Sequence, residues 1–119
     1  MIKTRVGFGY DMHKLEEGSY IMLGGIRIDS NHTVVAHSDG DIVLHSLSDA
    51  IYGSLAAGDI GTHFPSNKEN INIQSVKILK HACELITQSN YMINNIDITI
   101  VIGFIGFTCN LIIVLPICT

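Results

Sequence analysis

One stretch of the sequence, residues 37–59, restricts the possible folds of this chain more than any other. Its first thirteen positions hold three aspartates and two histidines, and the positions after them are almost wholly apolar and small. Apolar residues recur at spacings of three and four, which predicts a helix that runs to about Ala57 with one face in a core. Asp41, His45 and Asp49 recur every four residues on another side of that helix. The stretch therefore predicts a helix that links a core to a metal or phosphate site.

Strand and helix patterns alternate in the rest of the chain. Residues 3–13 and 20–28 predict two strands that form a hairpin, the second with a bend at its Gly-Gly pair. A second amphipathic helix is predicted to end near residue 89, and a strand rich in β-branched residues covers 95–102. This alternation predicts an α+β fold, a two-layer sandwich in which a mixed β-sheet carries helices on one face.

Asp11, His13 and His45 form a candidate metal site. Asp11 and His13 lie two residues apart, so a strand places them on the same face. Gly7 and Gly9 precede them on that face and leave it open for another backbone or a ligand. Three ligands of this type leave a fourth position on zinc for water or substrate, and imidazole suits zinc well. The spacing alone leaves open the alternative that these are surface residues or hydrogen-bonded core residues.

His37 and Ser38 lie just before the predicted helix, where the positive end of the helix dipole attracts anions. Their side chains could donate hydrogen bonds to a phosphate group. The alternative is that this segment only caps the helix, a role that Ser38, Asp39 or Asp41 could fill. Asp49 could orient an imidazole ring or accept a hydrogen bond from a substrate hydroxyl.

Composition and length exclude several classes of protein. A chain of 119 residues with 47% hydrophobic residues can form one domain with one core. The net charge of −4 argues against nucleic acid as a partner, whereas a phosphorylated small molecule is compatible with a metal that supplies positive charge. Three cysteines at irregular spacing, and no apolar secretory segment at the start, favour a reducing, cytoplasmic compartment.

The C-terminal part of the chain differs in composition, because residues 98–118 contain no charged side chain. Three interpretations are open: a buried strand followed by more core, a membrane tail anchor, and a tail that is not the native end of the domain. No Lys or Arg flanks the segment to orient it in a membrane, so a membrane partner is disfavoured. Hydropathy alone does not separate the three.

Four motifs follow one another along the chain. They are G-F-G-Y-D-M-H at 7–13, L-G-G-I-R-I at 23–28, A-H-S-D-G-D-I-V-L-H-S-L-S-D-A-I at 36–51 and G-D-I-G-T-H-F-P at 58–65. Together they resemble 2-C-methyl-D-erythritol 2,4-cyclodiphosphate synthases, and the resemblance covers residues 5–102. It implies the fold of that family and an enzyme, a phosphorus–oxygen lyase of the non-mevalonate isoprenoid (terpenoid) pathway.

The resemblance implies that the substrate is 4-diphosphocytidyl-2-C-methyl-D-erythritol 2-phosphate. Its 2-phosphate attacks the β-phosphorus, which forms 2-C-methyl-D-erythritol 2,4-cyclodiphosphate and releases CMP. The resemblance also implies zinc on Asp11, His13 and His45, and a second divalent ion, magnesium or manganese, that bridges the substrate phosphates. It further implies a homotrimer with active sites between neighbouring subunits, in the cytoplasm or, in a eukaryote, in the stroma of a plastid.

By the same resemblance, His37 is the catalytic residue that stabilises the transition state, and it holds the reacting phosphates together with Ser38. Asp59 and the backbone of Ile60 and Gly61 take the erythritol hydroxyls, and Phe64 lines the same pocket. The substrate-binding set that the resemblance implies is Asp11, His13, His37, Ser38, Asp59, Ile60, Gly61 and Phe64.

The chain departs from the family pattern at two places. Ser66 stands where the family tends to have aspartate, and from Gly103 onward the resemblance ends. The family continues with an A-Q-x-P-K-type loop that binds cytosine and a T-T-x-E-x-x-G segment that serves phosphate and the second metal ion. We therefore expect residues 1–102 to be the N-terminal part of a C-terminally truncated synthase domain. Residues 103–119 are expected to be an apolar tail outside the family. Since part of the family's site is missing, we expect turnover by this chain to be low. A catalytically incomplete metal-binding fragment is the alternative function.

Overall fold

A computed structural model of the chain describes residues 3–103 and 106–116. Four strands come first, three helical segments and a short 3₁₀ turn follow, and two long strands come last. The elements are β1 (Thr4–Glu17), β2 (Tyr20–Leu23), β3 (Ile26–Asp29), β4 (His32–Val35), α1 (Ile42–Ser54), α2 (Ile60–His63), η1 (Lys68–Asn70), α3 (Ser75–Gln88), β5 (Asn95–Gly103) and β6 (Gly106–Pro116).

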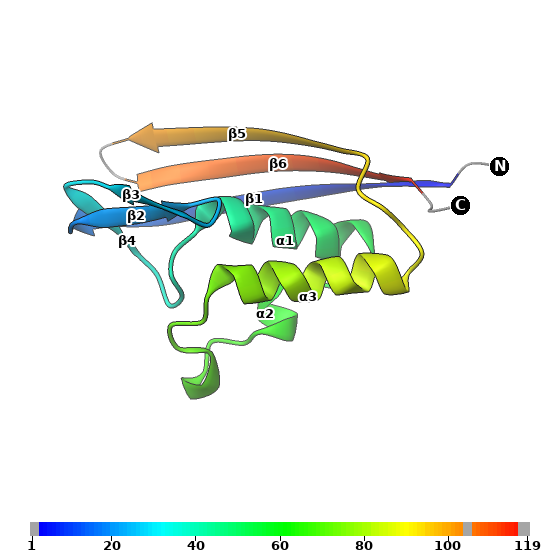
Figure 1. The fold of residues 1–119 in the computed structure, drawn as a ribbon, viewed down its shortest axis with the longest axis horizontal. Helices are drawn as coiled ribbons and strands as arrows, with labels where there is room; N and C mark the ends of the chain where they lie inside the picture. The colour runs from blue at the N-terminus through cyan, green and yellow to red at the C-terminus, as the bar shows by residue number, and fades with distance from the viewer. Residues whose placement is uncertain (1–2, 104–105, 117–119) are drawn as a thin grey trace.

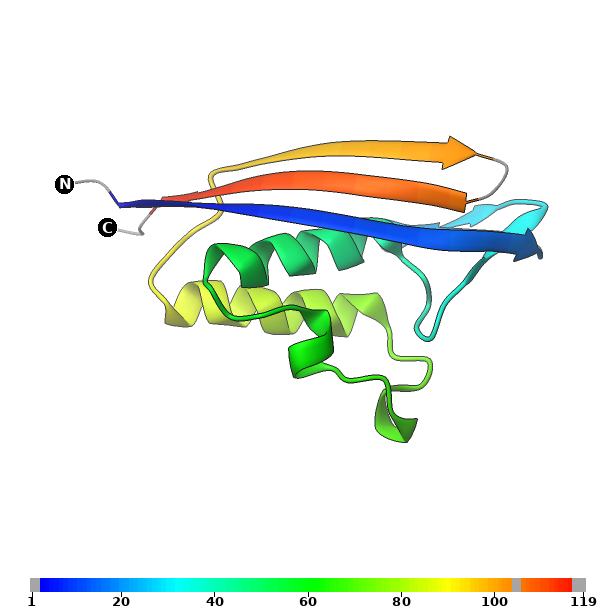
Figure 2. The same ribbon diagram turned by 180° about the vertical axis from the view of Figure 1, so that it is seen from behind.

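The molecule has two layers, a sheet and a layer of helices that covers one face of it (Figures 1 and 2). The main sheet has the strand order β4-β1-β6-β5, and β2 and β3 form a separate two-stranded sheet. The predicted α+β two-layer fold with helices on one face is confirmed. The prediction of a mixed sheet is wrong for the described strands, because all their pairings are antiparallel. Parallel strands need a long crossover connection between them. Only two residues separate the paired strands β5 and β6, so this pair must be antiparallel.

The predicted hairpin between residues 3–13 and 20–28 is also wrong. β1 continues to Glu17 and pairs with β4, with Lys14 opposite Val35. The 20–28 segment instead folds back on itself as β2 and β3, and two glycines with φ of 62° and 81° form the turn between them. Glycine adopts such positive φ values without a steric penalty, so a tight two-residue turn is available at this point.

Helix α1 packs against strand β1 with almost no side chain between the two backbones. A Cβ atom at Gly9 would lie 1.8 Å from the carbonyl oxygen of Ser46, and one at Gly7 would lie 1.9 Å from that of Ala50. The prediction that the two glycines leave the strand face open for another backbone is therefore confirmed. This close approach sets the height of α1 above the strand and the position of every side chain that α1 directs toward it.

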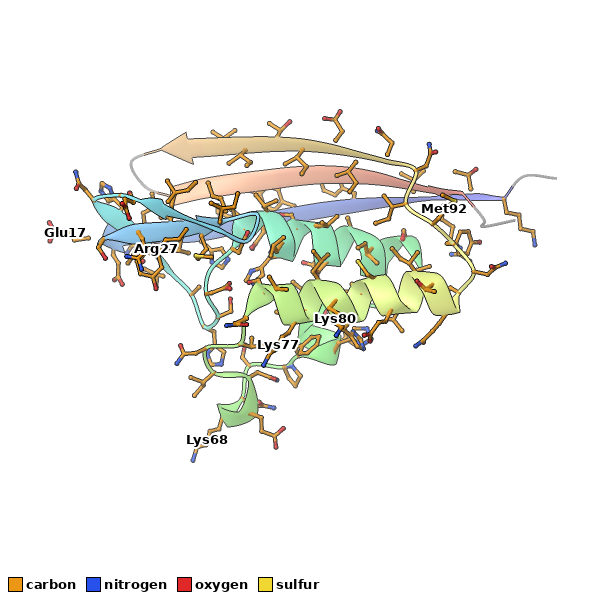
Figure 3. The ribbon with its side chains drawn as sticks, in the orientation of Figure 1. Glu17, Arg27, Lys68, Lys77, Lys80 and Met92 are labelled. Carbon is orange, nitrogen blue, oxygen red and sulfur yellow. The ribbon has the colours of Figure 1, made fainter. Side chains whose placement is uncertain are left out.

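The other side of α1 packs against α3. Buried apolar residues from both helices form the main core cluster: Ala50, Ile51, Tyr52, Ile78, Ala82 and Ile86. Lys77 and Lys80 of α3 extend away from the sheet (Figure 3). Helix α1 is shorter than predicted, because Ala56 adopts a positive φ of 54° shortly after the last helical residue, Ser54.

Asp41 holds the start of α1 and the β2–β3 turn together. Its fully buried carboxylate accepts hydrogen bonds from the backbone N–H groups of Leu44 (3.1 Å), Gly24 (3.0 Å) and Gly25 (2.6 Å). The first of these caps the helix, and the other two satisfy turn N–H groups that would otherwise lack a partner. Asp41, and not Ser38 or Asp39, is therefore the N-cap.

Strand β6 lies in the interior of the main sheet, where it pairs with β1 on one side and β5 on the other. Of the three interpretations of the tail, the strand is thus the one that the structure shows for residues 106–116, and residues 104–105 and 117–119 lie outside the described part. Among the described residues no helix combines the length and the apolar character needed to cross a membrane. The division of the chain at residue 102 stays a prediction.

Replacing Gly9 with alanine should destabilise the fold by about 3 kcal/mol or more, because the new methyl group would overlap the α1 backbone. Gly53→Ala is the matched control, since a Cβ there has its nearest neighbour outside the helix, the Phe8 carbonyl oxygen, at 4.0 Å. That variant should be neutral or up to about 1 kcal/mol more stable, because Gly53 lies within a helix. Urea unfolding followed by circular dichroism measures both. A Gly9→Ala variant as stable as the wild type would contradict the packing.

Candidate metal centre

The side chains of Asp11, His13 and His45 meet where the first turns of α1 lie over β1. Asp11 Oδ2 is 2.9 Å from His13 Nε2 and 3.1 Å from His45 Nδ1, and the two ring nitrogens are 3.4 Å apart. Asp11 and His13 follow the two glycines on the strand face beneath α1, as the alternation of a strand requires. The close packing of α1 on that face then brings His45 to them, although it lies 32 residues beyond His13.

The geometry of this group fits a tetrahedral divalent metal. Ligand atoms about 2.1 Å from a tetrahedral zinc ion lie about 3.4 Å from one another, close to the three separations between these atoms. Within the described residues these three side chains form the group whose donor atoms all lie within 4.8 Å of one another. Their exposed fractions are 21%, 17% and 12%, so the group is shielded but still reachable from solvent. Three protein ligands leave one position for water or substrate.

The charge of the group also suits a cation. Burial alone would raise the pKa of Asp11, but the hydrogen bonds and charges of His13 and His45 outweigh it and hold the pKa of Asp11 well below its ordinary value. Asp11 is therefore an ionised carboxylate, which supplies the negative charge that a hard or borderline dication requires.

The second ring nitrogen of His45 faces away from Asp11 and toward two hydroxyl groups. His45 Nε2 is 3.0 Å from Ser38 Oγ and 2.8 Å from Ser75 Oγ. Ser38 Oγ also accepts a hydrogen bond from the Gly40 N–H. Sequence reasoning missed Ser75, because the residue starts α3, 30 positions after His45, and only the tertiary fold brings the two together.

A cavity of about 130 Å³ opens beside this group. Five residues of the predicted substrate-binding set line it: His13, His37, Ser38, Ile60 and Phe64. His45 lines it too, and the remaining lining residues, not predicted, are Ser66, Asn70, Ile73 and Ile78. His37 reaches the cavity from an exposed position, with its Nε2 3.4 Å from the Asn67 carbonyl oxygen. Asp11, Asp59 and Gly61 lie outside the lining.

Asp49 and Asp59 hold the segment that follows α1. Asp49 Oδ1 accepts a hydrogen bond from the Ile60 N–H at 2.8 Å, and burial raises the pKa of this carboxyl. Asp59 caps α2, and hydrogen bonds from Thr62 lower the pKa of Asp59. The contact of Asp49 is thus with backbone and not with an imidazole ring, so its role in this structure is to position Ile60 at the cavity.

A family model described as the YgbB family matches residues 4–105 of the chain. The chain belongs to the YgbB family. A 2-C-methyl-D-erythritol 2,4-cyclodiphosphate synthase from Pseudomonas paraeruginosa is 47% identical over 98 residues, which are 82% of this chain and 62% of that protein. The enzyme of the same name from Acinetobacter baylyi is 48% identical over 101 residues, 84% of this chain and 62% of the relative.

The fold agrees with a solved structure of the same kind. IspF from Plasmodium falciparum, in a complex with CDP, superposes with a TM-score of 0.82 at 30% identity and covers 98% of this chain and 97% of its own. The chain nevertheless spans only 62% of the length of the curated relatives it matches.

Proposed function

We propose that this protein is a 2-C-methyl-D-erythritol 2,4-cyclodiphosphate synthase, a phosphorus–oxygen lyase that acts in isoprenoid biosynthesis. The observation that carries the proposal is that Asp11, His13 and His45 meet beside a cavity, which the two histidines line together with His37 and Ser38. A cation site beside hydrogen-bond donors is what a diphosphate needs, since its charge must be neutralised where it reacts. Membership of the YgbB family supports the same conclusion.

The substrate that we propose, 4-diphosphocytidyl-2-C-methyl-D-erythritol 2-phosphate, carries its own nucleophile. An oxygen of the 2-phosphate forms a bond to the β-phosphorus, and the bond from that phosphorus to the bridging oxygen of CMP breaks. The protein therefore needs no nucleophile of its own, and holding the folded substrate supplies much of the rate. His37 and Ser38 would donate hydrogen bonds to the reacting phosphates, and the backbone of Ile60 and Gly61 with Asp59 would hold the erythritol part.

The proposed ion at Asp11, His13 and His45 is zinc, because two imidazoles and one carboxylate are a common zinc set. When bound, it would act as a Lewis acid on the diphosphate. A second ion that bridges the phosphates would be magnesium or manganese, which prefer oxygen ligands. We also propose a reducing, cytoplasmic compartment, or a plastid stroma in a eukaryote.

Release of CMP from this substrate, measured with zinc and magnesium present, tests the proposed catalysis. The protein is used in excess over the substrate, because we expect turnover by the chain to be low. His37→Ala should slow release by about 100-fold or more, since it removes a group that stabilises the transition state. His32→Ala, which changes an exposed histidine of β4, should leave the rate unchanged. Phosphorus NMR follows both products. No cyclic diphosphate from the wild type, or equal rates for His37→Ala, would contradict the proposal.

We propose in addition that the protein forms a homotrimer. Val6, Phe8, Tyr10 and Met12 alternate with the glycines that face α1, so they lie on the opposite face of β1. Between 49% and 64% of each side chain is exposed. No described element covers this side of the sheet (Figures 1 and 3). An apolar patch of this kind is typical of an interface between subunits.

Light scattering should therefore give a mass of three times the 13.0 kDa chain. Phe8→Asp should give a monomer, because it would bury a charge at the centre of the apolar face. Ile26→Asp is the control, since it introduces the same charge at an exposed apolar position on β3. A monomeric wild type would contradict the trimer, and a trimeric Phe8→Asp variant would exclude this face as the interface.

A further inference from the structure

The side of His45 that faces away from the metal group carries a second arrangement of polar side chains. Ser75 Oγ lies 2.8 Å from His45 Nε2 and also contacts Asp39 Oδ1 in a short hydrogen bond. Ser75 is fully buried, at the first residue of α3. A buried hydroxyl in this position must satisfy its donor and its acceptor within the protein.

The carboxylate of Asp39 is held firmly in place. Its Oδ1 accepts a hydrogen bond from the Asp41 N–H at 3.2 Å, and its Oδ2 accepts one from the Ser75 N–H at 3.1 Å. Asp39 therefore connects the loop before α1 to the start of α3. Both backbone donors point at the carboxylate, which keeps its oxygens acting as acceptors.

The direction of the hydrogen bond between Ser75 and His45 follows from these contacts. A hydroxyl has one proton to donate, and an ionised carboxylate only accepts. The Ser75 proton therefore goes to Asp39, so Ser75 Oγ must accept from His45 and the proton of the imidazole must lie on Nε2. Nδ1 is then the nitrogen that hydrogen-bonds to Asp11 in the metal-free protein, and it is the one whose lone pair becomes available to a metal ion when its proton is lost.

We infer that Ser75 and Asp39 are positioning residues that orient His45 to bind the metal through Nδ1. Partners of this kind fix both the tautomer and the ring orientation of a histidine ligand and raise its basicity. Neither residue touches the candidate metal position, and neither belongs to the predicted site. The inference rests on the metal site of the proposed function and is independent of catalysis.

The affinity of the metal-free protein for zinc, measured by competition with a zinc-binding dye, tests the inference. Ser75→Ala should bind zinc about 10- to 100-fold more weakly than the wild type. Ser48→Ala is the matched control, because Ser48 is an equally buried serine whose hydroxyl donates to the Leu44 carbonyl and not to the site. An unchanged affinity of folded Ser75→Ala would overturn the inference.

A double-mutant cycle separates positioning from a general loss of structure. Because Asp39 acts through Ser75, Asp39→Asn should weaken zinc binding in the wild type and have little further effect in Ser75→Ala. Fully additive losses would overturn the inference. His45→Ala tests the site itself: if it binds zinc as tightly as the wild type, the metal site fails, and not only its positioning residues.

Nitrogen-15 NMR of the zinc-loaded wild type needs no variant and covers the case in which Ser75→Ala does not fold. The expected spectrum shows His45 coordinated through Nδ1, with a slowly exchanging proton on Nε2 that the Ser75 hydroxyl protects. Coordination through Nε2 would contradict the arrangement.

Discussion

The contact between the backbones of α1 and β1 is the constraint on which the rest of this structure depends. Gly7 and Gly9 allow it, because any side chain at either position would overlap the helix backbone. The same strand face then carries Asp11 and His13, and the first turns of the same helix carry His45. The close approach of helix to strand therefore also brings three metal-binding side chains together.

Two carboxylates, the buried Asp41 and the partly buried Asp39, continue this arrangement beyond the helix. Asp41 ties the start of α1 to the β2–β3 turn, and Asp39 ties the loop before α1 to the start of α3. Their partners are mainly backbone N–H groups at a helix end or a turn, where regular secondary structure offers no acceptor. Each carboxylate supplies the missing acceptor. The metal group is thus held from the strand below, the helix above and the loop beside it.

Local periodicity in the sequence was sufficient to predict the two long helices, α1 and α3, and the open glycine face. The ligand group was predicted by the family resemblance, because 32 residues separate His45 from His13 and spacing alone left its role open. The short helix α2 was not predicted. The sequence also did not predict which strands pair. The alternation in residues 3–13 shows a strand but not its partner, and the turn at the Gly-Gly pair decided that residues 20–28 fold on themselves. Ser75 was missed for a related reason: its contact with His45 spans 30 residues, and a serine at the start of a helix usually indicates only a cap.

The helix–strand packing builds the candidate metal site from one carboxylate and two imidazoles. X-ray absorption at the zinc edge of the zinc-loaded protein tests this site most directly. We expect nitrogen and oxygen atoms at about 2.0–2.2 Å from zinc, with the scattering of two imidazole rings. A sulfur ligand at about 2.3 Å, or the scattering of fewer than two imidazoles, would contradict it.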